Sequence, residues 1–296
     1  MAKILPFTGS GVALVTPFDG DKINYKSLGE LIEMHISAKT DAIIICGTTG
    51  EAPALADRDH LDILKYTVDK AAGRIPIIAG TGSNDTAHAI WFSQEAEQFG
   101  ADGVLCVTPY YNKTTQKGLY EHYKAIADSI SIPVILYNIP SRTGVNIAVE
   151  TLKKLADIEN IVAIKEASGD FGYAARIAAE VPELYIYSGN DNMVVPLMSL
   201  GAKGVISVVA NILPKDTHRL CGYCLDGDFT NGRELQLKML ELINSLFIEV
   251  NPIPIKAAMN LMGMDVGDVR LPLVSMSAEN KDKLKAAMRR YGICVK

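Results

Sequence analysis

The sequence lacks a surplus of positive charge. Its 29 Lys and Arg residues are outnumbered by 34 Asp and Glu residues, which gives a formal net charge of −5 at pH 7. Proteins that bind nucleic acid or anionic membranes by electrostatics need clusters of Lys and Arg. We therefore expect neither partner, and the composition favours a small-molecule ligand instead.

Long apolar runs and cysteine are also scarce. The apolar stretch that begins at Gly11 ends at Thr16 and Pro17, far short of a signal-peptide core or a membrane span. The chain has 5 cysteines, an odd number in 296 residues, and this does not form a disulfide framework. We predict reduced thiols and a cytoplasmic protein.

Several enzyme motifs are absent. The chain has no phosphate loop of the G-x-x-x-x-G-K-[ST] type, no G-x-S-x-G elbow and no H-E-x-x-H pair, and Thr16-Pro17-Phe18 stands where a dinucleotide fingerprint would follow the first strand. The single C-x-x-C pair, Cys221 and Cys224, has no second pair to complete a zinc site. None of the histidines follows a predicted strand, so we expect no metal and no cofactor; they are His35, His60, His88, His122 and His218.

Apolar residues, in contrast, are abundant at 48%, with 21% charged, as in a globular protein with a large core. They gather in short runs that have the length of strands buried on both faces. The runs start roughly 20 to 34 residues apart, which is the length of a strand-helix-loop unit. The eight runs are Val12–Val15, Ala42–Cys46, Pro76–Ala79, Gly103–Val107, Pro133–Tyr137, Val162–Ile164, Leu184–Tyr187 and Gly204–Val208.

Helical periodicity fills the segments between these runs, for example at Tyr25–Ser37 and Asp85–Phe99. Repeated strand-helix units of this kind predict a closed parallel (β/α)8 TIM barrel, with a doubly wound sheet as the alternative. We assign the barrel strands and most barrel helices to residues 1–211. Residues 212–296 are predicted to hold the last barrel helix and a C-terminal helical extension, with helices over Glu234–Ile248, Ile255–Leu261 and Glu279–Tyr291.

In a parallel barrel the chemistry lies at the carboxyl ends of the strands, and Lys165 directly follows the apolar run that ends at Ile164. An amine that is partly desolvated there becomes a nucleophile toward carbonyl carbons and can form a Schiff base. The alternative is a structural ion pair with Glu166 or a neighbouring carboxylate. The other lysine close to a strand, Lys203, precedes its strand and is predicted to be structural.

Polar residues end the other strands as well. Tyr137 follows the strand before Lys165 and can transfer protons to and from an imine, or simply pack at the barrel rim. Thr48 and Thr49 lie between two glycines, where hydroxyl and amide groups can approach a carboxylate, although such a segment is also a common tight turn. Arg142 follows Tyr137 in a loop with proline and glycine and can bind a carboxylate, or be an ordinary exposed arginine.

Six motifs together resemble the pyruvate-dependent class I aldolases and, among them, the dihydrodipicolinate (4-hydroxy-tetrahydrodipicolinate) synthase family. The resemblance runs from about Phe7 to the C-terminal helices. The motifs are Gly11–Phe18, Gly47–Glu51, Thr108–Asn112, Tyr137–Gly144, Ile164–Gly169 and Asn251–Lys256.

The resemblance implies a cofactor-free lyase that condenses pyruvate with aspartate 4-semialdehyde, the first committed step toward diaminopimelate and lysine. Lys165 would form the Schiff base, and Thr48, Tyr137 and Tyr111 would relay protons. Tyr111 would come from a neighbouring subunit, so that a dimer completes the site, within the tetramer that the resemblance implies. Thr49 and the backbone near Ile206 would bind the pyruvate carboxylate, and Arg142 that of the semialdehyde.

Two other readings stay open. Sialic acid (N-acetylneuraminate) lyase and keto-deoxy sugar acid aldolases share the lysine and tyrosine, although the pairs Thr48-Thr49 and Tyr110-Tyr111 and the run Ser141-Arg142-Thr143 favour the synthase. A barrel that binds pyruvate without turnover is the alternative from a different functional class.

Many members of the family bind lysine, the product of the pathway, at a dimer interface. His60, Asn84 and Tyr110 match the lysine-sensitive pattern. Ala52 lacks a hydroxyl, Asp57 replaces a histidine, and His88 replaces a carboxylate that would pair with the lysine ammonium. Because that charge-assisted contact contributes about 1.5 to 3 kcal/mol, we predict that lysine inhibition is weak or absent.

Overall fold

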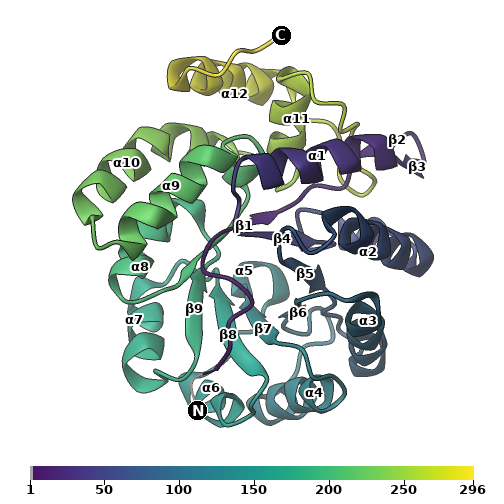
Figure 1. Ribbon diagram of the computed structural model, residues 1–296, viewed down its shortest axis with the longest axis vertical. Coiled ribbons are helices and arrows are strands. Elements are labelled where there is room, and N and C mark those ends of the chain that lie inside the picture. The colour runs from purple at the N-terminus through teal and green to yellow at the C-terminus, as the bar shows by residue number, and fades with distance from the viewer. Residues whose placement is uncertain (1–2) are drawn as a thin grey trace.

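A computed structural model describes residues 3–296 and contains a closed barrel of eight parallel strands (Figure 1). Each strand pairs with the next barrel strand along the chain, and the last strand closes on the first. The predicted TIM barrel is therefore confirmed, and a doubly wound open sheet is excluded. The barrel strands are β1 (Gly9–Ala13), β4 (Ala42–Ile45), β5 (Ile77–Gly80), β6 (Gly103–Val107), β7 (Val134–Asn138), β8 (Ile161–Glu166), β9 (Tyr185–Ser188) and β10 (Gly204–Ser207).

A ring of helices surrounds these strands (Figure 1). Several begin with a side-chain cap, such as Asn24, which accepts from the Ser27 amide, and Asp85, which accepts from the Ala87 amide. The helix predicted over Tyr25–Ser37 has the same bounds in the structure. The ring consists of α1 (Tyr25–Ser37), α2 (Asp57–Ala71), α3 (Thr86–Phe99), α4 (Gln116–Asp128), α6 (Val149–Ala156), α7 (Phe171–Glu180), α8 (Val194–Ser199) and α9 (Pro214–Leu225).

Three further helices follow α9. Figure 1 shows α11 and α12 outside the ring, close to α1, and α12 packs against both α10 and α11. Their bounds are α10 (Phe229–Ser245), α11 (Ile253–Leu261) and α12 (Ala278–Tyr291). The shorter elements are the hairpin strands β2 (Phe18–Asp19) and β3 (Lys22–Ile23), helix α5 (Pro140–Thr143), and the 3-10 turns η1 (Ala52–Ala54), η2 (Asp191–Met193) and η3 (Val209–Asn211).

The strands are buried on both faces because alternate residues point into the barrel and toward the helices. Ile44, Ile78 and Ile135 belong to the cluster inside the barrel, whereas Ile43 and Ile77 pack in the layer between strands and helices. Double burial explains why the strands read as continuous apolar runs. All five cysteines are free thiols.

Two strands, β1 and β8, differ from the prediction by two or more residues at one or both ends. β1 runs from Gly9 to Ala13. It starts where Gly9 pairs with Gly204, so closely that a Cβ on Gly204 would lie 1.8 Å from the Gly9 carbonyl oxygen. Glycine-rich strands give no apolar signal. β8 extends through Lys165 and Glu166, both of which pair with β7 and β9.

Within residues 3–296, no helix is both long and apolar enough to cross a membrane.

Candidate functional site

Lys165 and Tyr137 are direct neighbours on adjacent strands. They are register partners at the carboxyl ends of β8 and β7, and both are buried. The Lys165 Nζ atom lies 4.2 Å from the centroid of the Tyr137 ring. This contact holds the end of the Lys165 side chain against the Tyr137 ring. The Lys165 and Tyr137 side chains predicted from the sequence therefore lie side by side at the barrel mouth.

Glu166 does not pair with Lys165. Successive strand residues point to opposite faces, and the Glu166 carboxylate accepts hydrogen bonds from Asn138 Nδ2 at 2.8 Å and from the Ser168 amide at 2.6 Å. Burial raises the pKa of this carboxyl group. Among residues 3–296 no ion pair joins Lys165 to a carboxylate. The alternative of a structural Lys165–Glu166 pair is wrong, because the strand geometry separates the two side chains.

Thr48 and Thr49 lie in the loop that follows β4. Thr49 is buried, and its Oγ1 accepts a hydrogen bond from Asn251 Nδ2 at 2.9 Å. The loop runs close to its neighbours, since a Cβ on Gly50 would lie 3.2 Å from both the Cys46 amide nitrogen and the Leu14 carbonyl oxygen. A side chain at position 50 would require these backbone groups to move by a few tenths of an ångström.

Arg142 lies on the short helix α5, which begins at Pro140. Its Nη2 donates to the Asn251 carbonyl oxygen at 3.0 Å. Asn251 therefore contacts both Thr49 and Arg142 from the segment that precedes α11. The sequence indicated Asn251 only as part of a motif, because its contacts lie about two hundred and about one hundred residues away along the chain.

A cavity of about 520 Å³ opens beside these residues. Thr48, Tyr137 and Arg142 line it. The same cavity also reaches the residues predicted to resemble a lysine site, and these lining residues are Ala52, Asp57, His60, Asn84, His88 and Tyr110. Its size suits a small molecule with a few oriented polar groups. Lys165 does not line the cavity itself, but its Nζ contacts the ring of Tyr137, which does.

Neither Tyr111 nor Ile206 lines this cavity. Ile206 is buried in β10 opposite Gly11 of β1. Tyr111 is 92% exposed and has a φ of +66°, at the centre of a γ-turn closed by the Asn112 amide on the Tyr110 carbonyl oxygen at 2.9 Å. Turns with this sign of φ are rare and strained for a residue with a side chain. A single chain does not bring Tyr111 into the cavity.

The residues resembling a lysine site form one contact group. The His60 ring stacks on Phe92 with centroids 4.3 Å apart, and burial lowers its pKa to about 4. His88 Nε2 lies 3.2 Å from Asp57 Oδ1. Asn84 is tied to the Tyr111 loop, since its carbonyl oxygen accepts from Asn112 Nδ2 at 2.9 Å. His88 therefore already has a carboxylate partner.

The part of the chain that the structure describes holds no group of three or more His, Cys, Asp or Glu side chains placed to bind a metal ion. The buried Asp191 Oδ2 accepts hydrogen bonds from the amides of Val208 and Val209, which directly follow the strand that carries Ile206. In the sequence, Asp191 is one of several polar residues after the predicted strand Leu184–Tyr187, and nothing there marks its carboxylate as part of the site.

Comparisons with known proteins agree with this geometry. The model of the dihydrodipicolinate synthetase family matches residues 6–291. The chain is 59% identical to the 4-hydroxy-tetrahydrodipicolinate synthase of Acetivibrio thermocellus over 97% of this chain and 98% of the relative.

Solved structures of dihydrodipicolinate synthases are similar to this chain as well. The crystal structure of dihydrodipicolinate synthase from Aquifex aeolicus superposes with a TM-score of 0.96 at 47% identity, covering 98% of this chain and 100% of the other. The enzyme from Acinetobacter baumannii, crystallised in complex with pyruvate, has a TM-score of 0.94 at 45% identity, covering 97% and 99%. With a match across nearly its whole length in sequence and in structure, this chain belongs to the dihydrodipicolinate synthetase family.

Proposed function

We propose that this lyase condenses pyruvate with aspartate 4-semialdehyde through a Schiff base on Lys165. The observation that carries the proposal is the position of the Lys165 amine. It is buried at the carboxyl end of β8, in contact with the Tyr137 ring and not paired with Glu166. An amine in this setting is available to attack a carbonyl carbon.

In the proposed steps the Lys165 amine acts first as a nucleophile, and the imine that it forms then acts as the electron sink. Lys165 Nζ attacks the keto carbon of pyruvate, and water leaves to give the imine. Loss of a proton from the pyruvate methyl group gives an enamine, whose carbon attacks the aldehyde carbon and forms the new C–C bond. The amino group of the semialdehyde then attacks the imine carbon, closes the ring and releases Lys165. Each step moves a proton, which positioned hydroxyl groups can carry.

Tyr137 is the proposed first proton carrier, because its ring already touches the reacting amine. Thr48 lines the same cavity and is the proposed next member of the relay. Tyr111 is proposed as the third member, contributed by a second copy of the chain. The strained turn that exposes Tyr111 supports this assignment, since strain of this kind is retained where function requires it.

We assign the carboxylates of the two substrates to two groups that Asn251 contacts, Thr49 and Arg142. Thr49 and the backbone near Ile206 are proposed to bind the pyruvate carboxylate, and Arg142 that of the semialdehyde. Asn251 supports both assignments, because it hydrogen-bonds to Thr49 and to Arg142 and so fixes the spacing between them. A guanidinium oriented in this way suits bidentate binding of a carboxylate. The proposed active unit is a homodimer, within a tetramer.

Trapping the imine tests the proposal. Pyruvate followed by borohydride should add a pyruvate-sized mass that peptide mapping places on Lys165, and Lys165→Ala should remove it. Lys203→Ala is the matched control, because Lys203 also lies by an aromatic ring, with its Nζ 5.5 Å from the Tyr185 centroid, but belongs to the opposite end of the barrel. Full trapping in the Lys165→Ala variant would contradict the proposal.

Turnover with a coupled reductase then identifies the acceptor. Product from aspartate semialdehyde supports the proposed reaction. An adduct without this turnover would direct the search to the aldehydes that sialic acid lyases and keto-deoxy sugar acid aldolases use. Trapping with no turnover for any aldehyde would indicate a barrel that only binds pyruvate.

A further inference from the structure

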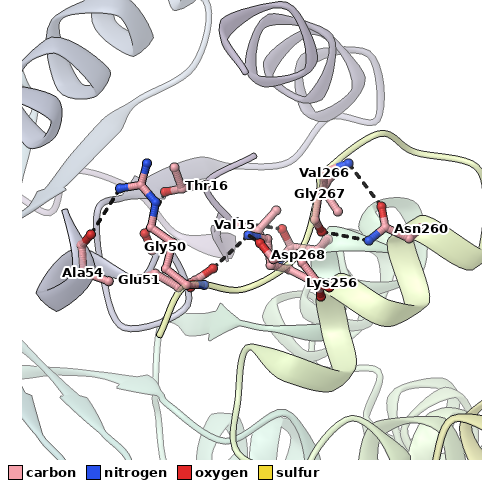
Figure 2. Close-up of polar contacts among 12 residues, drawn as sticks. Val15, Thr16, Gly50, Glu51, Ala54, Lys256, Asn260, Val266, Gly267 and Asp268 are labelled. Carbon is pink, nitrogen blue, oxygen red and sulfur yellow. Dashed lines mark hydrogen bonds and ion pairs between the residues drawn. The ribbon is translucent and has the colours of Figure 1, made fainter. Parts of the chain in front are cut away.

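Two charged side chains that the proposed mechanism does not use form a buried ion pair beside the candidate site. Lys256 Nζ lies 2.8 Å from Glu51 Oε1, and neither side chain is more than 2% exposed (Figure 2). Lys256 belongs to α11 in the C-terminal extension, and Glu51 ends the loop that carries Thr48 and Thr49. The pair therefore joins two parts of the chain that are 205 residues apart.

The remaining polar groups of the pair are also satisfied. The second Glu51 oxygen accepts from the Arg270 backbone amide at 2.8 Å, and Lys256 Nζ donates to the Asp268 carbonyl oxygen at 2.8 Å. The Lys256 Nζ atom also lies 4.0 Å from the centroid of the Phe18 ring. Figure 2 shows the Glu51 and Lys256 side chains pointing toward one another.

The loop needs such support because its backbone is strained. Glu51 has a φ of +56°, in the left-handed region that a residue with a side chain seldom adopts. A residue stays in this conformation only where its surroundings hold it. Two groups from the C-terminal extension, the Lys256 ammonium and the Arg270 backbone amide, donate hydrogen bonds to the Glu51 carboxylate. The Thr16 hydroxyl donates to the neighbouring Gly50 carbonyl oxygen at 2.7 Å.

One short segment holds the loop at two points. Asn251 donates to Thr49, and Lys256, five residues later, donates to Glu51. The contacts fall on alternate residues of the loop, on either side of Gly50. A buried ion pair adds little stability compared with well-packed apolar residues, but it can specify one arrangement of the chain. This pair, at the loop that carries two candidate site hydroxyls, is therefore suited to setting geometry.

We propose that Glu51 and Lys256 are positioning residues that fix the Thr48–Thr49 loop to the C-terminal extension and so set the placement of both hydroxyls for the reaction. This inference rests on the proposed function. It predicts that the extension, which contributes no group to the Schiff base, controls how well pyruvate binds and reacts.

Lys256→Met tests the inference, because methionine reaches as far as the lysine Cε position and removes the ammonium group. A shift of about 1 Å in catalytic groups can cost 100-fold, so kcat/KM for pyruvate should fall about 10- to 100-fold per folded molecule. Lys283→Met is the control: it removes an ion pair with Glu279, 2.7 Å long, from exposed α12 of the same extension and should leave kcat/KM unchanged. Circular dichroism sets the assay temperature below every unfolding transition.

The double variant Glu51→Gln with Lys256→Met keeps the experiment decisive if Lys256→Met alone does not fold. It removes both buried charges, so stability should recover, yet the charged link between Glu51 and α11 is lost and kcat/KM should stay low. Recovery of kcat/KM together with stability, or an unchanged kcat/KM in folded Lys256→Met, would overturn the positioning role. Trapping of pyruvate on Lys165 in the wild-type chain is measured alongside, and only its failure counts against the proposed function.

Discussion

Lys165 and Tyr137 are register partners on β8 and β7, with the Lys165 Nζ atom 4.2 Å from the centroid of the Tyr137 ring. The contact has two separable parts. The ring supplies the face on which the amine rests, and the phenol oxygen supplies an exchangeable proton. A substitution that keeps the ring and removes only the oxygen can tell these two contributions apart.

Tyr137→Phe should keep the fold and the Schiff base but slow turnover. General acid-base catalysis by one positioned group contributes about 100- to 10,000-fold, so we expect kcat to fall within that range while borohydride trapping persists. Tyr185→Phe is the control, since this tyrosine lies on β9 at the opposite end of the barrel. Equal kcat values in wild type and Tyr137→Phe would remove Tyr137 from the proton relay.

Tyr111 offers a test of sharing between subunits. Lys165→Ala and Tyr111→Phe should each be nearly inactive, but mixed dimers contain one site with an intact lysine and an intact Tyr111 from the partner. Re-assembly of an equal mixture should therefore recover about a quarter of the wild-type rate, because half of the dimers are mixed and each has one complete site. If Tyr111 acted within its own chain, mixing would restore nothing.

Tyr111→Phe should also leave stability unchanged, because the side chain is 92% exposed in the single chain. Surface substitutions of this kind change the free energy of unfolding by about 0.5 kcal/mol or less. A large fall in the thermal midpoint would assign the loss of activity to unfolding rather than to the relay.

Lysine should inhibit weakly or not at all. His88 stands where the lysine-sensitive pattern has a carboxylate, and its Nε2 lies 3.2 Å from Asp57. His88→Glu restores the carboxylate, and a charge-assisted contact of about 1.5 to 3 kcal/mol corresponds to about a 10- to 100-fold lower inhibitory lysine concentration. Steady-state rates against lysine check both chains, and full inhibition of the wild type at low lysine concentration would contradict the prediction.

The sequence was enough to predict the barrel, the family and the enzyme class, and the structure and comparisons confirm these three. The barrel could be predicted because every strand is buried on both faces and repeats at the spacing of a strand-helix unit. Family motifs then supplied the candidate site, whose individual roles stay predictions. The position of Lys165 at a strand end followed from local sequence alone.

What the sequence did not predict depends on contacts between distant residues. Asn251 and Lys256 were visible as a motif, but their partners Thr49 and Glu51 are more than two hundred positions away. The start of β1 was missed because Gly9 is placed by its close crossing with Gly204 rather than by any apolar pattern. Side-chain partners across the fold have no local signature in a single sequence.

Buried histidines make stability depend on pH. Burial lowers the pKa of His35 to about 3 and the pKa values of His60 and His122 to about 4, from an ordinary value of 6.5. The unfolded chain therefore binds protons at these sites below pH 6.5, whereas the folded chain does not until about pH 4. Their contribution to stability is present in full above pH 6.5 and is lost as the pH falls toward the folded-state values.

His122→Gln isolates one of these groups. Glutamine can keep a hydrogen bond to Thr86, which lies 2.9 Å from His122 Nδ1, and it does not titrate. A shift from 6.5 to about 4 makes His122 cost about 2 kcal/mol at about pH 5 relative to about pH 8, so the variant should gain that much on the wild type as the pH is lowered. Taking the difference between the two chains cancels buried carboxyls such as Glu166, whose raised pKa acts in the opposite direction. Urea unfolding at both pH values measures the free energy of unfolding of each chain. Parallel pH profiles for the two chains would contradict the prediction, because they would show that folding does not lower the pKa of His122.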